Sequence, residues 1–352
     1  MPGVRREQGR LRKELGLSLE GRVRGRLVEL ALGAGFHRAA FVDPCLVEAA
    51  AHRVPAGRPG LEWDWITAPS RWSRSASILV CCLSCRRCEP DDRSTPGDPH
   101  ALVAPFARAH YYRQAVRMLD GVVRRLEGET GIPRSSVRLF SNSRLPEKPL
   151  LVATGLAAFG RNGCTIVPGL GSLFVIAGAV IPLPSRTEEP GAPLDDPCGS
   201  CRRCRGACPV SAIDEPYVVR TDLCLQAMAS SLGKLPGYIM EAWGARLYGC
   251  QECQAACPHN SGLSVEAHPA TGEIGPSLPL RGLLSDDDGE RRSRFRGTAL
   301  GMSWVPVDAL LRNALAAAGN RGDPVIRKEV ERYLAHGTEA VRGAARWALE
   351  RL

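Results

Sequence analysis

The sequence predicts a multidomain α+β protein in three parts: an α/β domain over residues 1–184, a cysteine-rich module over 185–265 and a helical domain over 266–352. Three observations support this division. Strand and helix patterns alternate through the first part, eight cysteines fall within the second, and amphipathic helical patterns close the chain. A length of 352 residues is enough for two or three such domains.

Strand and helix patterns follow one another in the first part. Residues 20–43 read as an amphipathic helix and then a strand, with Gly33 and Gly35 at the break. Continuous apolar runs are typical of buried strands, and amphipathic spacing is typical of helices. We therefore expect strands over 76–83, 137–140 and 173–182, and helices over 109–130 and 150–159.

The last part begins with a polar, Gly- and Pro-rich segment over 261–290, which we expect to form a loop. Asp323-Pro324 then starts a helix, with Pro in the first turn. A second helix follows His336-Gly337 to the end of the sequence. Two antiparallel helices of this kind predict a HEAT-like domain.

Composition is ordinary for a globular protein, with 44% hydrophobic and 24% charged residues. No stretch approaches the roughly 20 apolar residues that span a bilayer, and the basic N-terminus lacks the apolar core of a signal peptide. We therefore expect a cytoplasmic protein with no membrane partner. The net charge of +9 is compatible with a polyanion such as RNA, but a general excess of arginine without such a partner also explains it.

The strongest motif is Cys198-x2-Cys201-x2-Cys204-x3-Cys208-Pro209, which has the spacing of bacterial ferredoxins. A second copy, Cys250-x2-Cys253-x3-Cys257-Pro258, lacks its first cysteine. Cys224 lies between the copies and can supply the missing thiolate. The count then closes at eight ligands, which is what two [4Fe–4S] clusters require.

In motifs of this kind, the fourth cysteine binds the other cluster. We therefore assign cluster 1 to Cys198, Cys201, Cys204 and Cys257, and cluster 2 to Cys208, Cys224, Cys250 and Cys253. Two structural zinc sites are the alternative, but zinc ribbons use paired C-x2-C units.

Six cysteines are not among these eight, and four of them lie close together in sequence, namely Cys81, Cys82, Cys85 and Cys88. Their spacing could hold a third metal. Cys81 and Cys82 sit in an apolar run, however, which favours burial as small hydrophobic residues.

The clusters are expected to pass electrons to a site in the first part of the chain. Neither a dinucleotide-binding G-x-G-x-x-G in the right context nor a Walker motif occurs there. The segment from Thr154 to Gly163 contains glycines that would let the backbone approach a large cofactor. A plain turn that ends a helix is the alternative.

These features together resemble the epoxyqueuosine reductases, which are cobalamin-dependent iron–sulfur enzymes of tRNA modification. The likeness covers nearly the whole chain. It rests on CGSCRRCRGACPVSAI, RLYGCQECQAACPHN, EKPLLVATGLAAFGRNGCTIV and RGTALGMSWVPVDALLRNALAAAGN. The YGCQECQ–CPHN and LLRNALAAAGN segments are the specific parts of it.

The resemblance implies an N-terminal corrinoid domain, with Gly160, Arg161 and Asn162 beside cobalamin, a double-cluster module and HEAT-like helices that help to hold tRNA. It implies an oxidoreductase that converts epoxyqueuosine to queuosine in tRNA. A low-potential electron donor would supply the clusters, which would reduce the cobalt, and a proton donor would assist loss of the epoxide oxygen. A paralogous corrinoid and iron–sulfur reductase with another substrate, or a non-catalytic electron carrier, are the alternatives.

Two departures from the family lie on the side of the active site. The family has a proton-donating Asp where this sequence has Ser141 or, with a shift of one residue, Asn142. Neither is a carboxylic acid, although either could hydrogen-bond a ligand and so belong to the cofactor site. The catalytic residue is therefore unknown from the sequence. The second departure is the segment 225–230, where the family has a more Tyr-Leu-Thr-Ile-Glu-like stretch.

Basic residues in the last part are candidates for contact with tRNA phosphates, namely Arg312, with its neighbour Asn313, and the arginine-rich segment 291–296. A solvated basic face, with Arg312 paired locally, explains them equally well. We expect Trp243, Trp304 and Trp347 to be core residues rather than platforms for base stacking.

Overall fold

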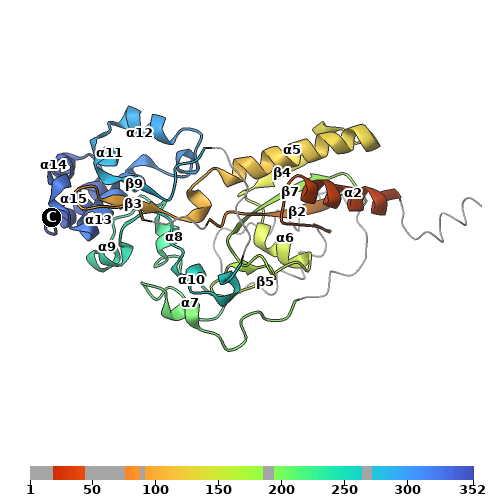
Figure 1. Cartoon of the computed structure of the whole chain (residues 1–352), viewed down its shortest axis with the longest axis horizontal. Helices are drawn as coiled ribbons and strands as arrows, with labels where there is room; N and C mark the ends of the chain where they lie inside the picture. Colours follow the sequence, from red (N-terminus) through yellow and green to blue (C-terminus); the bar gives the residue numbers. More distant parts are fainter. Residues whose placement is uncertain (1–18, 44–75, 88–91, 185–193, 264–271) are drawn as a thin grey trace, which may run out of the picture. The chain divides into compact units, whose positions relative to one another are not determined.

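The computed structural model describes residues 19–43, 76–87, 92–184, 194–263 and 272–352 (Figure 1). The chain divides into two compact units. Unit 1 is drawn from Met1–Leu83, Ala115–Ala158 and Val175–Asp195, and unit 2 from Ser84–Gln114, Phe159–Phe174 and Asp196–Leu352. Two stretches of the predicted first part, 84–114 and 159–174, thus belong to unit 2. The division into three parts by residue number stays a prediction.

Unit 1 is built on a four-stranded sheet with the order β1-β2-β7-β4. Its strands are β1 (Arg38–Val42), β2 (Ser77–Ser84), β7 (Phe174–Ile181) and β4 (Arg138–Ser141). β1 pairs antiparallel with β2, with Ala40 opposite Val80, and β4 pairs antiparallel with β7, with Phe140 opposite Gly178. These strands confirm the ones predicted from apolar runs.

The strand β2 is buried along its whole length. Cys81 and Cys82 are fully buried in it, which confirms that they act as small hydrophobic residues. Burial raises the pKa of both thiols well above the ordinary value, so they stay protonated. Cys85 is buried just after the strand, and Cys88 lies outside the described residues.

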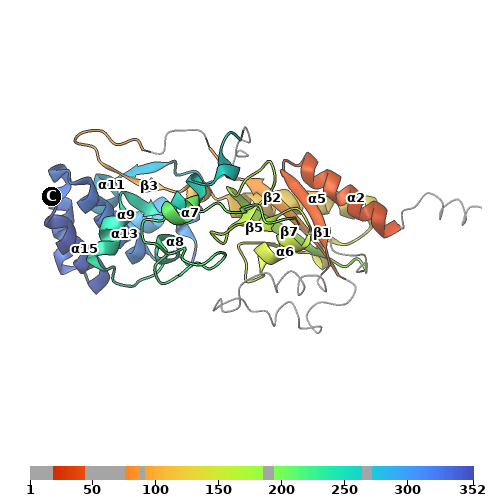
Figure 2. The same ribbon diagram turned by 90° about the horizontal axis from the view of Figure 1, so that it is seen from below.

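Three helices accompany this sheet: α2 (Leu19–Gly33), α5 (Tyr111–Thr130) and α6 (Glu147–Ala153). Figures 1 and 2 show α2 and α5 on one side of the sheet and α6 on the other. The prediction of a helix over 150–159 is wrong for the second half of that range. Gly155 has a φ of 77°, the left-handed conformation that commonly ends a helix, and Ala158–Phe159 forms strand β5.

Unit 2 contains a three-stranded sheet with the order β8-β3-β9. Its strands are β3 (His100–Val103), β8 (Arg246–Tyr248) and β9 (Ser277–Pro279). β3 is parallel to β8 and antiparallel to β9. The loop predicted over 261–290 is therefore wrong in its described part, which contains β9 and helix α11 (Leu280–Ser285).

The core of unit 2 forms around helix α13 (Val307–Arg321), which is buried on nearly every side. It packs against α9 (Gly237–Trp243), α11 and α15 (Glu339–Leu349). At Gly319 the approach to α15 is so close that an added Cβ would lie 2.6 Å from a ring carbon of Trp347. Only glycine fits there without displacing the tryptophan.

The paired helices of the last part differ from the prediction. Pro324–Ile326 forms a 3-10 helix, capped by the Asp323 side chain, and α14 (Arg327–Glu331) and the 3-10 helix Arg332–Ala335 follow it. The long helix beside α15 is α13 instead. The HEAT-like assignment stays a prediction, and none of the described helices is long and apolar enough to cross a membrane.

Two of the three tryptophans occupy the core as predicted. Trp243 is 1% exposed and Trp347 is 8% exposed. The prediction is wrong for Trp304, which is 47% exposed because it lies in the turn that precedes α13.

Candidate iron–sulfur centre

The eight cysteines of the two motifs all lie in unit 2, within or next to short helices. α7 (Arg203–Gly206) contains Cys204 and α10 (Glu252–Ala255) contains Cys253, and these two helices lie side by side (Figure 1). Cys224 directly precedes α8 (Leu225–Met228), and Cys257 directly precedes the 3-10 helix Pro258–Asn260. Cys257 is buried and the other seven are partly exposed.

The two motifs fold in the same way. In the first, the Arg205 amide donates to the Arg202 carbonyl at 3.1 Å, and in the second the Gln254 amide donates to the Gln251 carbonyl at 2.8 Å. The matching bond that closes each motif runs from Ser211 to Cys208 in one copy and from Asn260 to Cys257 in the other. The sequence repeat is therefore also a repeat of backbone structure.

Electrostatic interactions between their thiols define a first group of cysteines. Burial raises the pKa of Cys198, Cys204 and Cys257, and neighbouring thiols raise it further. Cys257 is close enough to interact with Cys198 and Cys201, and Cys204 interacts with Cys198 and Cys257. These are the four cysteines assigned to cluster 1 by the crossover rule, although Cys257 is far from the other three in sequence.

A second group contains Cys224, Cys250 and Cys253. Burial is the main cause of the raised pKa of Cys250 and Cys253, and each also interacts with Cys224. Cys253 interacts with Cys204 as well, so the two groups adjoin. The assignment of Cys208 to cluster 2 rests on the motif.

Two of the sulfur atoms accept hydrogen bonds from the backbone. The Arg161 amide donates to Cys198 Sγ at 3.4 Å, and the Ala212 amide donates to Cys208 Sγ at 3.2 Å. Such bonds stabilise negative charge on sulfur and help to set the reduction potential of a cluster.

The loop predicted to lie beside cobalamin holds the cysteine loops in place. The Arg161 guanidinium donates to the Gly199 carbonyl at 2.5 Å, and Asn162 Nδ2 donates to the Cys253 carbonyl at 3.4 Å. Gly160 is packed so closely that an added Cβ would lie 2.8 Å from Ile166 Cδ1. Arg161 thus contacts the first cysteine motif and Asn162 the second. The role of the three residues toward cobalamin stays a prediction.

Sequence reasoning missed a ninth cysteine in this region. Cys164 follows the same loop and interacts with Cys253 and Cys257, which belong to different groups. Its amide donates to Asn162 Oδ1 at 3.1 Å. The sequence offers no spacing signal for it, because Cys164 belongs to neither motif.

The two residues at the position of the family's aspartate lie in unit 1, at the end of β4. Ser141 Oγ donates to the Ile176 carbonyl at 2.6 Å, and Asn142 is exposed with a φ of 49°. Nearby, the Glu147 carboxylate accepts from the Ser143 amide at 2.7 Å and from Ser143 Oγ at 3.0 Å. Burial outweighs these bonds and raises the pKa of Glu147 to about 7.

The raised pKa of Glu147 predicts a pH-dependent stability. The folded state binds this proton more tightly than the unfolded state, so its stabilising effect is complete below about pH 4.5 and is lost as the pH rises through 7. We expect the free energy of unfolding of the wild type, relative to Glu147→Gln, to fall by about 1–3 kcal/mol over that range. Urea unfolding at several pH values measures this difference. A constant difference would contradict the raised pKa.

Arg312 and Asn313 are not available to tRNA phosphates, because both are buried in α13. Arg312 donates to the carbonyls of Met228, Ser231 and Gly233 at 2.6–2.8 Å. Asn313 donates to the carbonyls of Ala229 and Leu247, both at 2.9 Å. The alternative of a solvated face with local pairing is wrong too, because these carbonyls lie 79–84 residues from Arg312 in sequence. These two side chains tie the chain after Cys224 and the chain before Cys250 to one helix.

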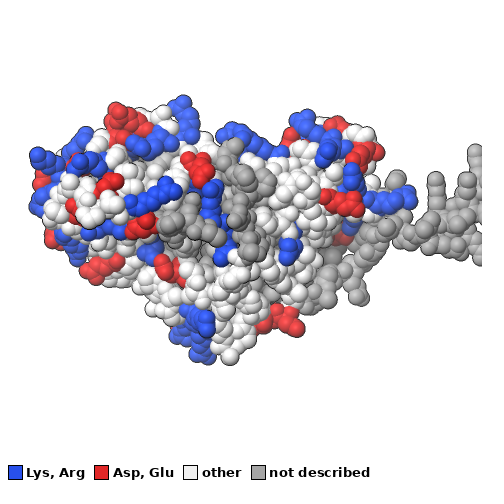
Figure 3. All heavy atoms as spheres, in the orientation of Figure 1, with Lys and Arg blue, Asp and Glu red and all other residues white. Residues whose placement is uncertain are grey.

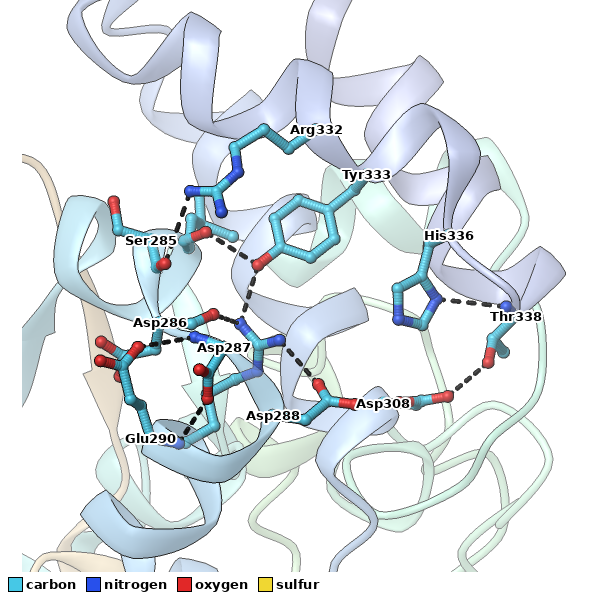
Figure 4. Close-up of polar contacts among 12 residues, drawn as sticks. Ser285, Asp286, Asp287, Asp288, Glu290, Asp308, Arg332, Tyr333, His336 and Thr338 are labelled. Atoms are coloured by element: carbon cyan, nitrogen blue, oxygen red, sulfur yellow. Dashed lines mark hydrogen bonds and ion pairs between the residues drawn. The ribbon is translucent and has the colours of Figure 1, made fainter.

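The arginine-rich segment 291–296 lies mainly in α12 (Asp288–Phe295), which begins with a capping box between Asp287 and Glu290. Arg291 is buried there, where it donates to Tyr333 Oη at 2.9 Å and to the Asp288 carboxylate at 2.8 Å. Figure 4 shows Tyr333 and Asp288 converging on this point. Arg291 is therefore a packing residue, whereas Arg292 and Arg296 are exposed.

The donor set fits [4Fe–4S] clusters. Thiolate sulfur is the usual protein ligand of such clusters. Here it can come from the two adjoining groups of cysteines described above. Backbone N–H groups already point at two of the sulfur atoms.

Comparison with known proteins supports this interpretation. Residues 197–260 match the model of the 4Fe-4S double cluster binding domain family. The chain is 29% identical over 218 residues to the epoxyqueuosine reductase of Bacillus subtilis (strain 168), covering 61% of this chain and 55% of the relative. It is 34% identical over 236 residues to that of Burkholderia pseudomallei (strain K96243), covering 63% and 56%. The chain thus spans about half the length of these relatives.

A solved structure shares the fold. The structure of an epoxyqueuosine reductase with an epoxyqueuosine-modified tRNA-Tyr stem loop aligns with a TM-score of 0.78, covering 94% of this chain and 90% of that one, at 23% identity. At this identity the likeness concerns the fold alone. These comparisons support the epoxyqueuosine reductase family for this chain.

Proposed function

We propose that the chain is an iron–sulfur oxidoreductase that converts epoxyqueuosine to queuosine in tRNA, with two [4Fe–4S] clusters and cobalamin as cofactors. The observation that carries the proposal is the grouping of the cysteines of both motifs in unit 2. Removal of an epoxide oxygen as water takes two electrons and two protons. A pair of clusters suits this need, because each carries one electron at a time.

The proposal gives two tasks to the motif cysteines and to the loop beside them. The eight motif cysteines hold the clusters, as assigned above. The loop of Gly160, Arg161 and Asn162 orients the cysteine loops and stabilises charge on Cys198 sulfur. Cobalamin is proposed because the family resemblance implies it. When bound, it would supply the metal that reduces the epoxide, while the protein supplies position, electrons and protons.

Glu147 is our candidate for the proton donor, because Ser141 and Asn142 cannot act as acids. It is a carboxyl group at the start of α6 in unit 1, and with a pKa of about 7 much of it holds a proton at neutral pH. We expect Glu147→Gln to lower the rate of epoxide reduction by about 10²–10⁴-fold. The rate of the wild type should fall above pH 7, as the acid form disappears. Iron content should not change.

A control separates this role from a structural one. Ser141→Asp restores a carboxyl group at the family's position, so Ser141→Asp/Glu147→Gln should regain activity if only an acid is missing. An unchanged rate in Glu147→Gln would exclude Glu147 as the donor.

A second candidate function is reduction of another substrate by the same cofactors. The departures at Ser141, Asn142 and the segment 225–230 favour it. The deciding experiment prepares the protein without oxygen, adds cobalamin and a low-potential reductant, and supplies epoxyqueuosine-containing tRNA. Formation of queuosine supports the first function. Cobalamin binding without queuosine supports the second, and failure to bind cobalamin supports an electron carrier.

A further inference from the structure

The two cysteine motifs differ in the side chains between their ligands, although their backbones match. The first motif has arginine at positions 202, 203 and 205, and the equivalent positions of the second are Gln251, Glu252 and Gln254. Arg202 and Gln251 both precede a short helix, with φ/ψ of −131°/17° and −126°/9°. The turn that presents the cysteines therefore needs no arginine.

Two side chains of the second motif have partners within the protein. Glu252 pairs with Arg246 at 2.5 Å, and Gln254 Oε1 accepts from Ser172 Oγ at 3.0 Å. The side chains of the first motif face solvent instead. Arg202 and Arg203 form no ion pair within the described part of the chain, and Arg205 meets Asp214 at 3.2 Å on the surface.

Beside these arginines lies a pocket of about 290 Å³, with Cys204 in its wall. Arg161, Arg202 and Arg205 line it, opposed by Asp214 and Glu215. The buried Nε of Arg161 has no hydrogen-bond partner among the described residues. Figure 3 shows basic side chains gathered where Figure 1 places α7. The pocket thus opens toward a cysteine of cluster 1, with three arginines facing two carboxylates around it.

We propose that Arg202, Arg203 and the pocket beside Cys204 form the docking surface for an acidic electron-carrier protein that reduces cluster 1. One electron passes from the reduced carrier to the oxidised cluster, and no bond or proton is exchanged. Opposite charges on the two surfaces accelerate the encounter and orient the carrier. The proposal rests on the clusters of the proposed function but requires neither cobalamin nor epoxyqueuosine.

The test follows the bleaching of cluster absorbance when the cluster-loaded protein is mixed anaerobically with a reduced acidic plant-type ferredoxin. We expect the second-order rate constant to fall about tenfold or more in R202E/R203E, and its dependence on salt to flatten. Iron content and reduction by dithionite should match the wild type. The control R327E/K328E makes the same charge change on exposed residues of α14 and should leave the rate within about twofold of the wild type.

Two results would overturn the docking proposal. One is an unchanged rate constant in R202E/R203E. The other is an equal loss in both double variants, which would mean that only net charge matters. If R202E/R203E instead lowers affinity for tRNA and leaves reduction by the ferredoxin unchanged, the surface binds nucleic acid. No arm of this test measures queuosine. Its result therefore does not depend on whether the chain reduces epoxyqueuosine, and the two proposals can fail separately.

Discussion

Cys224→Ala is expected to lower the iron content of the anaerobically reconstituted chain from about eight atoms to about four, because cluster 2 loses a thiolate ligand. Cys224 is the ligand that the sequence motif does not contain, since the second copy lacks its first cysteine. Its thiol interacts with those of Cys250 and Cys253. Iron and acid-labile sulfide analysis measures the loss.

Cys164→Ser is the matched control for this variant. Cys164 also lies next to Cys253, and it adjoins Cys257 as well, but it belongs to neither motif. We expect its replacement to leave the iron content unchanged. The opposite pattern, with iron lost in Cys164→Ser and kept in Cys224→Ala, would reassign the ligands of cluster 2.

Arg312→Met is expected to destabilise unit 2 by about 3 kcal/mol or more. The substitution removes the buried guanidinium that donates to the carbonyls of Met228, Ser231 and Gly233. Burial lowers the pKa of Arg312 to about 10, so the side chain is still charged at neutral pH. These carbonyls follow Cys224 closely, and we therefore expect weaker retention of cluster 2 as well.

Two comparisons make this prediction specific. Arg312→Lys should recover only part of the stability, because one ammonium group cannot reproduce the fork of a guanidinium. Arg292→Met changes an exposed arginine of α12 and should alter stability by no more than about 0.5 kcal/mol. Urea unfolding and iron retention measure both effects. Stability equal to the wild type in Arg312→Met, together with weaker binding of tRNA, would restore the original interpretation as a phosphate contact.

Local patterns predicted those features whose physical cause is local. Strand β2 and helix α5 follow from an apolar run and from helical spacing, and the cysteine turns follow from their ligand spacing. The crossover rule grouped Cys257 with Cys198, and the two thiols do interact in the structure. The assignment of each ligand to a cluster stays a prediction.

Features that depend on distant partners could not be predicted. Strand β3 has four residues, and its partners β8 and β9 lie more than a hundred residues away. Arginine in a helix usually indicates a solvated face, so Arg312 gave no sign that it binds carbonyls inside the protein. The same holds for stretches 84–114 and 159–174, which join unit 2 although they are flanked by unit 1.

The most direct test of the account is the metal content of the chain after anaerobic reconstitution with iron and sulfide. Two [4Fe–4S] clusters predict about eight iron atoms and about eight sulfides per chain, and a reduced sample with the electron paramagnetic resonance signals of two interacting clusters. A chain that retains zinc, or that binds far fewer than eight iron atoms, would contradict the assignment of the cysteines.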